Sequence, residues 1–168
     1  TVTLLLKPVV VMAHLLGGMT TLALLWWLSL SPPTADSGRH RLTSLALAGV
    51  AVVIVQIALG GWTSTNYAAL ACPAFPSCNG NWWPEMDFAE GFRLWRGLGV
   101  DYEGGVLHNS ARMAIHYSHR IFALAVIIVL GSLIARGLRD RTRQDIRAAA
   151  RLLAAALTTQ LVVGIAIV

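Results

Sequence analysis

Charged residues are scarce in this sequence: Asp, Glu, Lys and Arg make up 12% of its 168 residues, while 56% are hydrophobic. A soluble domain carries about a quarter charged residues. The shortage of charge therefore argues against an ordinary soluble fold and indicates a protein that lies in lipid. A net charge of +5 would suit a nucleic-acid binder. However, the basic residues cluster in short segments between long apolar runs, so we expect no nucleic-acid partner.

Cysteine is also nearly absent, since the sequence holds only Cys72 and Cys78. Structural zinc needs four ligands, and His108 is the only nearby histidine outside the apolar runs, which argues against a zinc site. Pro73 and Pro76 lie between the cysteines and favour a tight loop. A disulfide staple and a redox-active pair are both compatible with this loop. The staple is favoured because no charged activator adjoins either thiol.

Two further signals are missing at the ends of the chain. The sequence begins with Thr1 in place of an initiator methionine, and it stops at Val168 inside an apolar run. We therefore expect a fragment that is truncated at both ends. The first apolar run has no basic leader and no small-residue cleavage site, so no signal peptide is indicated.

Four charge-poor runs are long enough to cross a bilayer, which takes about 20 apolar residues in a helix. In hydrocarbon every backbone polar group needs an internal partner, and runs of this length suit helices better than the strands of a barrel. We therefore predict an all-α fold, a polytopic transmembrane helix bundle of four spans with a long extracytoplasmic loop. The spans cover residues of about 8–30, 42–62, 113–135 and 148–168, and the outer loop covers about 63–112.

The distribution of arginine predicts the orientation, because cytoplasmic loops are enriched in basic residues. Arg39 and Arg41 lie in the first loop, and five arginines between 136 and 147 crowd the third. Both loops are therefore expected in the cytoplasm. In the outer segment Phe88, Phe92 and Trp95 recur at helical spacing between charged residues, which predicts a short interfacial helix.

Histidines inside membrane helices are functional candidates, because an unpaired ionisable group is costly in lipid. His14 and His119 each lie about 16 residues from the cytoplasmic end of a span, or about 24 Å at 1.5 Å per residue, so both are expected near the outer leaflet. His116 precedes His119 by one turn on the same helix face. Neutral imidazole is a strong axial ligand of haem iron, so two histidines at one depth predict a bis-His haem site.

Residues beside these histidines suit a haem. Gly17 and Gly18 follow His14 by one turn and leave room for a flat macrocycle, and Arg120 can pair with a haem propionate. For His14 alone, a hydrogen bond to a neighbouring helix is an equally good interpretation. Gly60 and Gly164 end two similar five-residue stretches, Gln56 to Gly60 and Gln160 to Gly164, and this similarity reflects either an internal repeat or glycines that let helices pack closely.

Longer motifs in these regions resemble the haem A synthase family in its bacterial form, and the resemblance spans essentially the whole chain. The motifs lie at residues 13–18 (AHLLGG), 59–73 (LGGWTSTNYAALACP), 78–84 (CNGNWWP), 86–92 (MDFAEGF) and 115–120 (IHYSHR). The family has eight membrane helices in two similar halves, and this chain resembles the fourth to the seventh. The resemblance implies a multi-pass protein of the bacterial inner membrane.

The resemblance also implies a reaction and its residues. Haem A synthases oxidise a methyl group of haem O to the formyl group of haem A, with a bound haem b as cofactor. His14 would be an axial ligand where haem O sits, and His119 a ligand of haem b. His116 stands near the cofactor without being an assigned ligand, and Cys72 and Cys78 match a cysteine pair thought to form a disulfide.

The resemblance bears on partners as well. The second ligand of each haem and a catalytic glutamate belong to helices that are absent here, so we expect the isolated chain to be inactive and to need the missing helices. Haem O synthase is an expected partner besides the lipid bilayer. Two other functions stay open from the residues alone: an electron-transfer cytochrome in which His14 and His119 share one haem b, and a membrane scaffold without haem.

Overall fold

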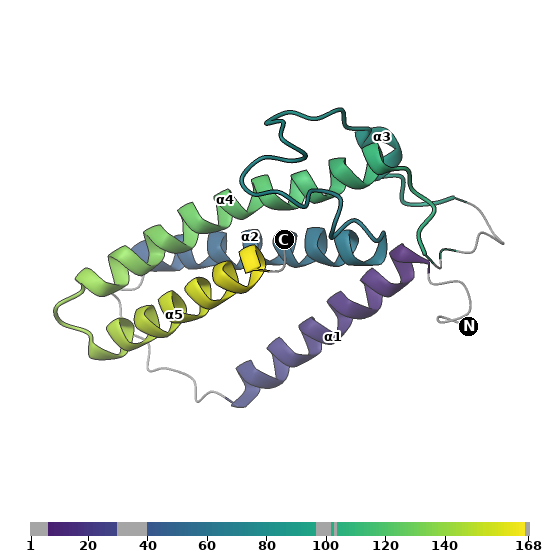
Figure 1. Ribbon diagram of the computed structural model, residues 1–168. Helices are drawn as coiled ribbons and strands as arrows, with labels where there is room; N and C mark the ends of the chain where they lie inside the picture. The colour runs from purple at the N-terminus through teal and green to yellow at the C-terminus, as the bar shows by residue number, and fades with distance from the viewer. Residues whose placement is uncertain (1–6, 30–39, 97–101, 103, 167–168) are drawn as a thin grey trace. The chain divides into compact units, whose positions relative to one another are not determined.

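The computed structural model describes residues 7–29, 40–96, 102 and 104–166. Within these residues the regular secondary structure is helical, apart from one isolated antiparallel bridge between Cys78 and Asn81. The helices in chain order are α1 (Pro8–Ser29), α2 (His40–Thr65), α3 (Phe88–Gly91), α4 (Asn109–Arg139) and α5 (Gln144–Ala166), as Figure 1 shows.

Four of these helices, α1, α2, α4 and α5, are long and apolar enough to cross a membrane. Many of their large apolar side chains are exposed, among them Leu28 (82%), Leu47 (65%) and Ile128 (67%). Lipid covers such side chains in a membrane, whereas water would make their exposure unfavourable. The predicted all-α class with four membrane helices is thus confirmed.

The helices extend beyond the apolar runs from which the spans were predicted. The span expected at about 113–135 lies inside α4, which begins at Asn109 and ends at Arg139. Hydropathy marks only the part of a helix that suits hydrocarbon, while the helix continues through polar residues toward the surface. The expected span end at residue 30, the loop residue Arg39 and the span end at 167–168 lie outside the described residues.

The chain forms two compact units, each described here by itself. The first unit comprises Thr1–Ala35 and Ile57–His119, and the second comprises Asp36–Gln56 and Arg120–Val168. The boundary between them falls inside α2 and α4. Every candidate haem ligand lies in the first unit.

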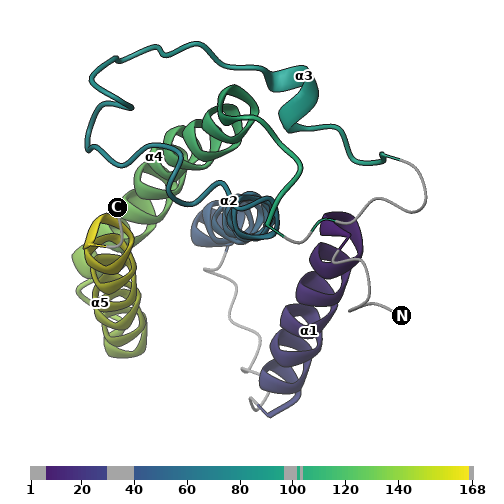
Figure 2. The ribbon, with the colours of Figure 1, turned by 45° about the vertical axis from the view of Figure 1, so that its right-hand side comes forward.

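The first unit has a small core where the ends of its helices meet the segment between α2 and α4. Figure 2 shows this segment, which carries α3, beside the N-terminal end of α4. The core residues are Met12, Trp62, Ala68, Leu107, Ala111 and Ile115. The indole Nε1 of Trp62 donates a hydrogen bond of 2.9 Å to the carbonyl of Gly91. Trp62 is therefore buried within the protein (7% exposed), whereas Trp82 and Trp83 are exposed.

Helix α3 is shorter than the expected amphipathic helix, which would have continued to Trp95. It begins after Asp87, whose side chain accepts a hydrogen bond from the N–H of Glu90, and it ends at Gly91. Two side chains satisfy carbonyls at this end. Trp62 donates to the carbonyl of Gly91, and Arg96 folds back to donate to the carbonyl of Glu90 at 2.6 Å. The last carbonyls of a helix need such partners from outside the helix.

In the second unit, small residues let the helices approach closely. A side chain at Gly49 of α2 would come within 3.0 Å of Leu130 of α4, and one at Gly137 of α4 within 2.8 Å of Ala150 of α5. The turn from α4 to α5 is held by Asp140, whose carboxylate accepts from the hydroxyl and the N–H of Thr142. These hydrogen bonds hold the pKa of Asp140 below its usual value.

Candidate functional site

His119 lies on α4 in direct contact with the backbone of α2. Its ring atom Cε1 is 3.1 Å from the position that a Cβ atom would take at Gly60, and both ring nitrogens are 3.8 Å from that position. Any side chain at residue 60 would crowd the imidazole. Because Gly60 has no side chain, the edge of the His119 ring that carries both nitrogens can pack against α2.

The neighbouring glycine has a different partner. Successive residues of a helix project about 100° apart, so Gly61 faces away from His119. A Cβ atom at Gly61 would meet the sulfur of Met12, and it would lie 2.8 Å from Leu15, both on α1. The Gly60–Gly61 pair thus lets α2 approach α4 on one side and α1 on another.

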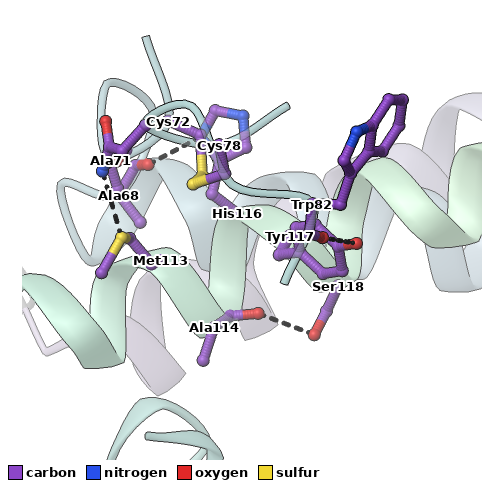
Figure 3. The surroundings of a disulfide bond; sticks show 11 residues. Ala68, Ala71, Cys72, Cys78, Trp82, Met113, Ala114, His116, Tyr117 and Ser118 are labelled. Atoms are coloured by element: carbon purple, nitrogen blue, oxygen red, sulfur yellow. Dashed lines mark hydrogen bonds between the residues drawn. A yellow bond between two sulfur atoms is a disulfide. The ribbon is translucent and has the colours of Figure 1, made fainter. Parts of the chain in front are cut away.

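His116 lies one turn before His119 and is buried (4% exposed). Its Nδ1 is 2.9 Å from the carbonyl oxygen of Ala68 (Figure 3). A carbonyl oxygen only accepts, so Nδ1 carries the hydrogen. This hydrogen bond ties the segment after α2 to the helix that carries His119.

The carbonyl of Ala68 is placed by the way in which α2 ends. The N–H of Ala68 donates to the backbone carbonyl of Thr63 at 2.9 Å, and the N–H of Tyr67 donates to that of Ser64 at 3.1 Å. With Tyr67 in the left-handed region at φ 53°, these two bonds form a Schellman motif. Glycine usually occupies that position, because a Cβ atom is strained there. The motif reverses the chain so that Ala68 faces α4.

The two cysteines form a disulfide bond that packs on α4 beside His116. Cys72 and Cys78 are fully buried, their Cα atoms are 4.6 Å apart, and they cluster with Ala71 and Met113. Asn79 donates from Nδ2 to the sulfur of Met113 at 3.2 Å. Figure 3 shows the disulfide over the turn of α4 that holds Met113 and His116.

The next part of this segment is also attached to α4. The hydroxyl of Tyr117 donates to the carbonyl of Trp82 at 2.6 Å. The ring of Trp83 packs edge-on against the Tyr117 ring, with centroids 5.6 Å apart. The residues around His116 and His119 are therefore held by a segment that is distant in sequence.

His14 stands apart from this arrangement. It lies on α1 and is exposed, whereas Met12 and Leu15 turn toward Gly61 of α2. One turn further along α1, no atom from elsewhere in the described residues lies within 4 Å of the Cβ positions of Gly17 and Gly18. Within this part of the chain, His14 therefore lies beside a glycine-lined surface that offers room for a flat ligand.

Two other residues singled out in the sequence are Arg120 and His108. Arg120 is half-buried and follows His119 directly, so its side chain leaves α4 on another side. His108 is exposed in the segment before α4. Sequence reasoning had identified Gly60 only as a packing residue, and Ala68 and Arg112 not at all as site residues. Their contacts cross between distant segments and leave no local sequence signal.

Chemically, the site offers two imidazoles that lie beside residues without side chains. His119 borders Gly60, and His14 borders Gly17 and Gly18. Imidazole nitrogen in an apolar helical bundle is a common ligand of haem iron. Among the described residues, no group of three or more His, Cys, Asp or Glu side chains could hold a metal ion.

Comparisons with known proteins identify relatives. A family model described as cytochrome oxidase assembly protein matches residues 1–168. A protein named Heme A synthase from Shewanella oneidensis is 42% identical over 170 residues, which cover 98% of this chain and 51% of that protein. Another Heme A synthase, from Sphingopyxis alaskensis, is 31% identical over 160 residues, which cover 91% of this chain and 40% of that protein.

No solved structure matches the chain, so its family is assigned from sequence. The chain spans about half the length of the curated relatives that it matches. Because the family model covers every residue, and both relatives align over nearly all of the chain, this protein belongs to the haem A synthase family of cytochrome oxidase assembly proteins.

Proposed function

We propose that this chain contributes haem-binding helices to a membrane oxidoreductase that converts the methyl group of haem O to the formyl group of haem A. In this proposal His119 would hold the iron of a resident haem b, and His14 would hold the iron of the substrate haem O. Family membership supports the reaction class. The glycines that border each histidine support the ligands.

The observation that carries the proposal is the contact between His119 and Gly60. A ligand histidine needs a ring that its neighbours hold in place. The Cε1 atom of His119 lies 3.1 Å from the Cβ position of Gly60, so the imidazole packs against the backbone of α2 at a residue without a side chain. This packing and the chemistry of imidazole support His119 as a residue that could hold a haem.

Haem b, when bound, would supply the one-electron redox chemistry that these side chains lack. The protein residues have other tasks. His14 and His119 bind and orient the two macrocycles, and Arg120 pairs with a propionate. His116 holds the disulfide-bearing segment against α4 through Ala68. The disulfide of Cys72 and Cys78 keeps that segment compact.

We further propose that the protein lies in the bacterial inner membrane, with residues 63–112 on the outer side. The arginines of the α4–α5 turn support this orientation. In this arrangement haem O synthase is the partner that supplies the substrate. Helices that this chain does not include would provide the second ligand of each haem.

The test is the absorption spectrum of the full-length protein in detergent, with extracted haem identified by chromatography. His119→Ala should remove the b-type signal, and His14→Ala should remove bound haem O or haem A while haem b stays. His108→Ala is the matched control, because His108 is exposed outside the helices. If either substitution abolished a single shared haem b, the electron-transfer cytochrome would replace the synthase.

A further inference from the structure

Arg112, in the first turns of α4, has a guanidinium group whose hydrogen-bonding capacity is largely unused. A guanidinium carries five N–H donors. Among the described residues, its buried Nε has no hydrogen-bond partner, and its Nη2 reaches the carbonyl of Gly104 at only 3.4 Å. That distance exceeds the usual range for a hydrogen bond. A charged donor left unpaired in a partly buried place indicates a missing acceptor.

The backbone around this guanidinium is shaped to leave space. Gly105 has φ 84°, which favours glycine, and a Cβ atom there would lie 2.8 Å from Nη2 of Arg112. The same position is 3.2 Å from the ring of Tyr67. Tyr67 itself occupies a left-handed conformation where glycine is usual. Strained residues of this kind often mark functional sites.

Helix geometry connects Arg112 with the proposed haem ligand. Arg112, His116 and His119 lie on one face of α4, because positions seven apart are two turns apart. Arg112 is about 10 Å nearer the N-terminal end of α4 at 1.5 Å per residue. Long helical side chains also lean toward the N-terminus. The guanidinium therefore lies beyond the histidines, at the end of α4 next to the segment that holds α3.

Glu90 of α3 is already paired. It contacts Arg96, and it also lies 3.8 Å from Arg93. An external anion would supply the acceptor that Arg112 lacks among the described residues. Arginine is the side chain whose planar fork matches a carboxylate in a bidentate pair.

We propose that Arg112 binds a propionate carboxylate of the haem held by His119, with Gly105 and Tyr67 forming the walls of this anion site. The inference rests on the proposed function. It differs from the role of Arg120, which leaves α4 on another side. The propionates are the polar edge of an apolar macrocycle, so a cation at one end of the helix also sets which way the haem faces.

The experiment uses full-length protein freed of haem and titrated with haem b and with haem b dimethyl ester, in which both carboxylates are neutral. The wild type should prefer the free acid by about 10- to 100-fold, as charge-assisted hydrogen bonds imply. Arg112→Gln should lose a clear part of this preference while the part due to Arg120 remains, and Arg112→Lys should lose less. Arg93→Gln is the matched control and should keep it fully, because Arg93 is exposed (61%).

Circular dichroism of each variant shows whether the total helix content of the protein is retained. If Arg112→Gln is folded and still prefers the free acid as the wild type does, the anion site is wrong. It is also wrong if Arg112→Gln changes only the anionic phospholipid retained on purification, because the anion is then a lipid phosphate. Haem b that binds in the wild type and is lost in His119→Ala supports the proposed function separately. A wild type that binds no haem overturns both proposals.

Discussion

Replacing Gly60 by alanine tests the contact on which the haem b site depends. The new methyl group would lie 3.1 Å from Cε1 of His119, while ordinary contact begins at 3.4 Å. The imidazole must then retreat by about 0.3 Å, or the two helices must separate. Metal–ligand distances tolerate changes of only about 0.2 Å. The coordinating edge of His119 would thus leave the position that iron requires.

We expect Gly60→Ala to weaken haem b binding by about 10- to 100-fold, the usual effect of disturbing a group that orients a metal ligand. The free energy of unfolding should fall by only about 0–2 kcal/mol, because two effects oppose each other. Crowding in a packed interface costs about 1–3 kcal/mol. Alanine in place of glycine inside a helix offsets about 1 kcal/mol of that cost. The loss should therefore appear in haem affinity while the protein remains folded.

The assay is a titration of haem-depleted full-length protein with haem b, followed by absorbance, with thermal unfolding measured in parallel. Gly164→Ala is the first control, because nothing lies within 4 Å of its Cβ position. Gly61→Ala is the second, because its methyl group would meet α1 and not His119. Unchanged haem b affinity and spectrum in Gly60→Ala would refute the reasoning.

Three further predictions concern the rest of the chain. Trp62→Phe should lower the free energy of unfolding by about 1–3 kcal/mol, because the buried carbonyl of Gly91 loses its donor. Trp83→Phe replaces an exposed ring and should change the free energy of unfolding little. If both variants lowered it equally, the stabilising role of the Trp62 hydrogen bond would be contradicted. Replacing both Cys72 and Cys78 by serine should lower the free energy of unfolding by about 2 kcal/mol through loop entropy, as measured by denaturant unfolding. An equal free energy of unfolding for the oxidised and the reduced wild type would contradict this prediction. Asp140 has a lowered pKa, so its hydrogen bonds with Thr142 stabilise the α4–α5 turn above its unfolded pKa, and this contribution is lost as pH falls through the lower folded value. Carbon NMR of labelled aspartate should show this low pKa, and Thr142→Ala should raise it.

The membrane helices were predictable because their signal is local. Charge-free runs of about 20 residues must be helical in hydrocarbon, whatever their neighbours do. The pairing of His116 and His119 on one face also followed from helical spacing alone. What hydropathy could not locate were the ends, since α4 continues from Asn109 to Arg139 through residues that are not apolar.

The contacts of the site were less predictable because they depend on distant residues. The bond between His116 and Ala68 joins positions 48 apart in sequence. It also requires the left-handed Tyr67, where a sequence pattern would look for glycine. Similarly, the end of α3 is held by Trp62, 29 residues away, which donates to the carbonyl of Gly91. Spacing within one segment carries no information about such long-range contacts.

The attachment of the disulfide-bearing segment to α4 has a consequence for biogenesis. Cys72 and Cys78 are only 6 positions apart, so the crosslink can close as soon as that stretch of chain is exposed to an oxidant. The loop is attached to α4 through the carbonyls of Ala68 and Trp82. Their partners on α4, His116 and Tyr117, follow 48 and 35 residues later in the chain. During synthesis from the N-terminus, the stapled loop must therefore wait for α4 to be inserted. Delayed insertion of that one helix would leave an oxidised but undocked loop, and His119, the proposed haem ligand, would be the last residue of the unit to reach its place.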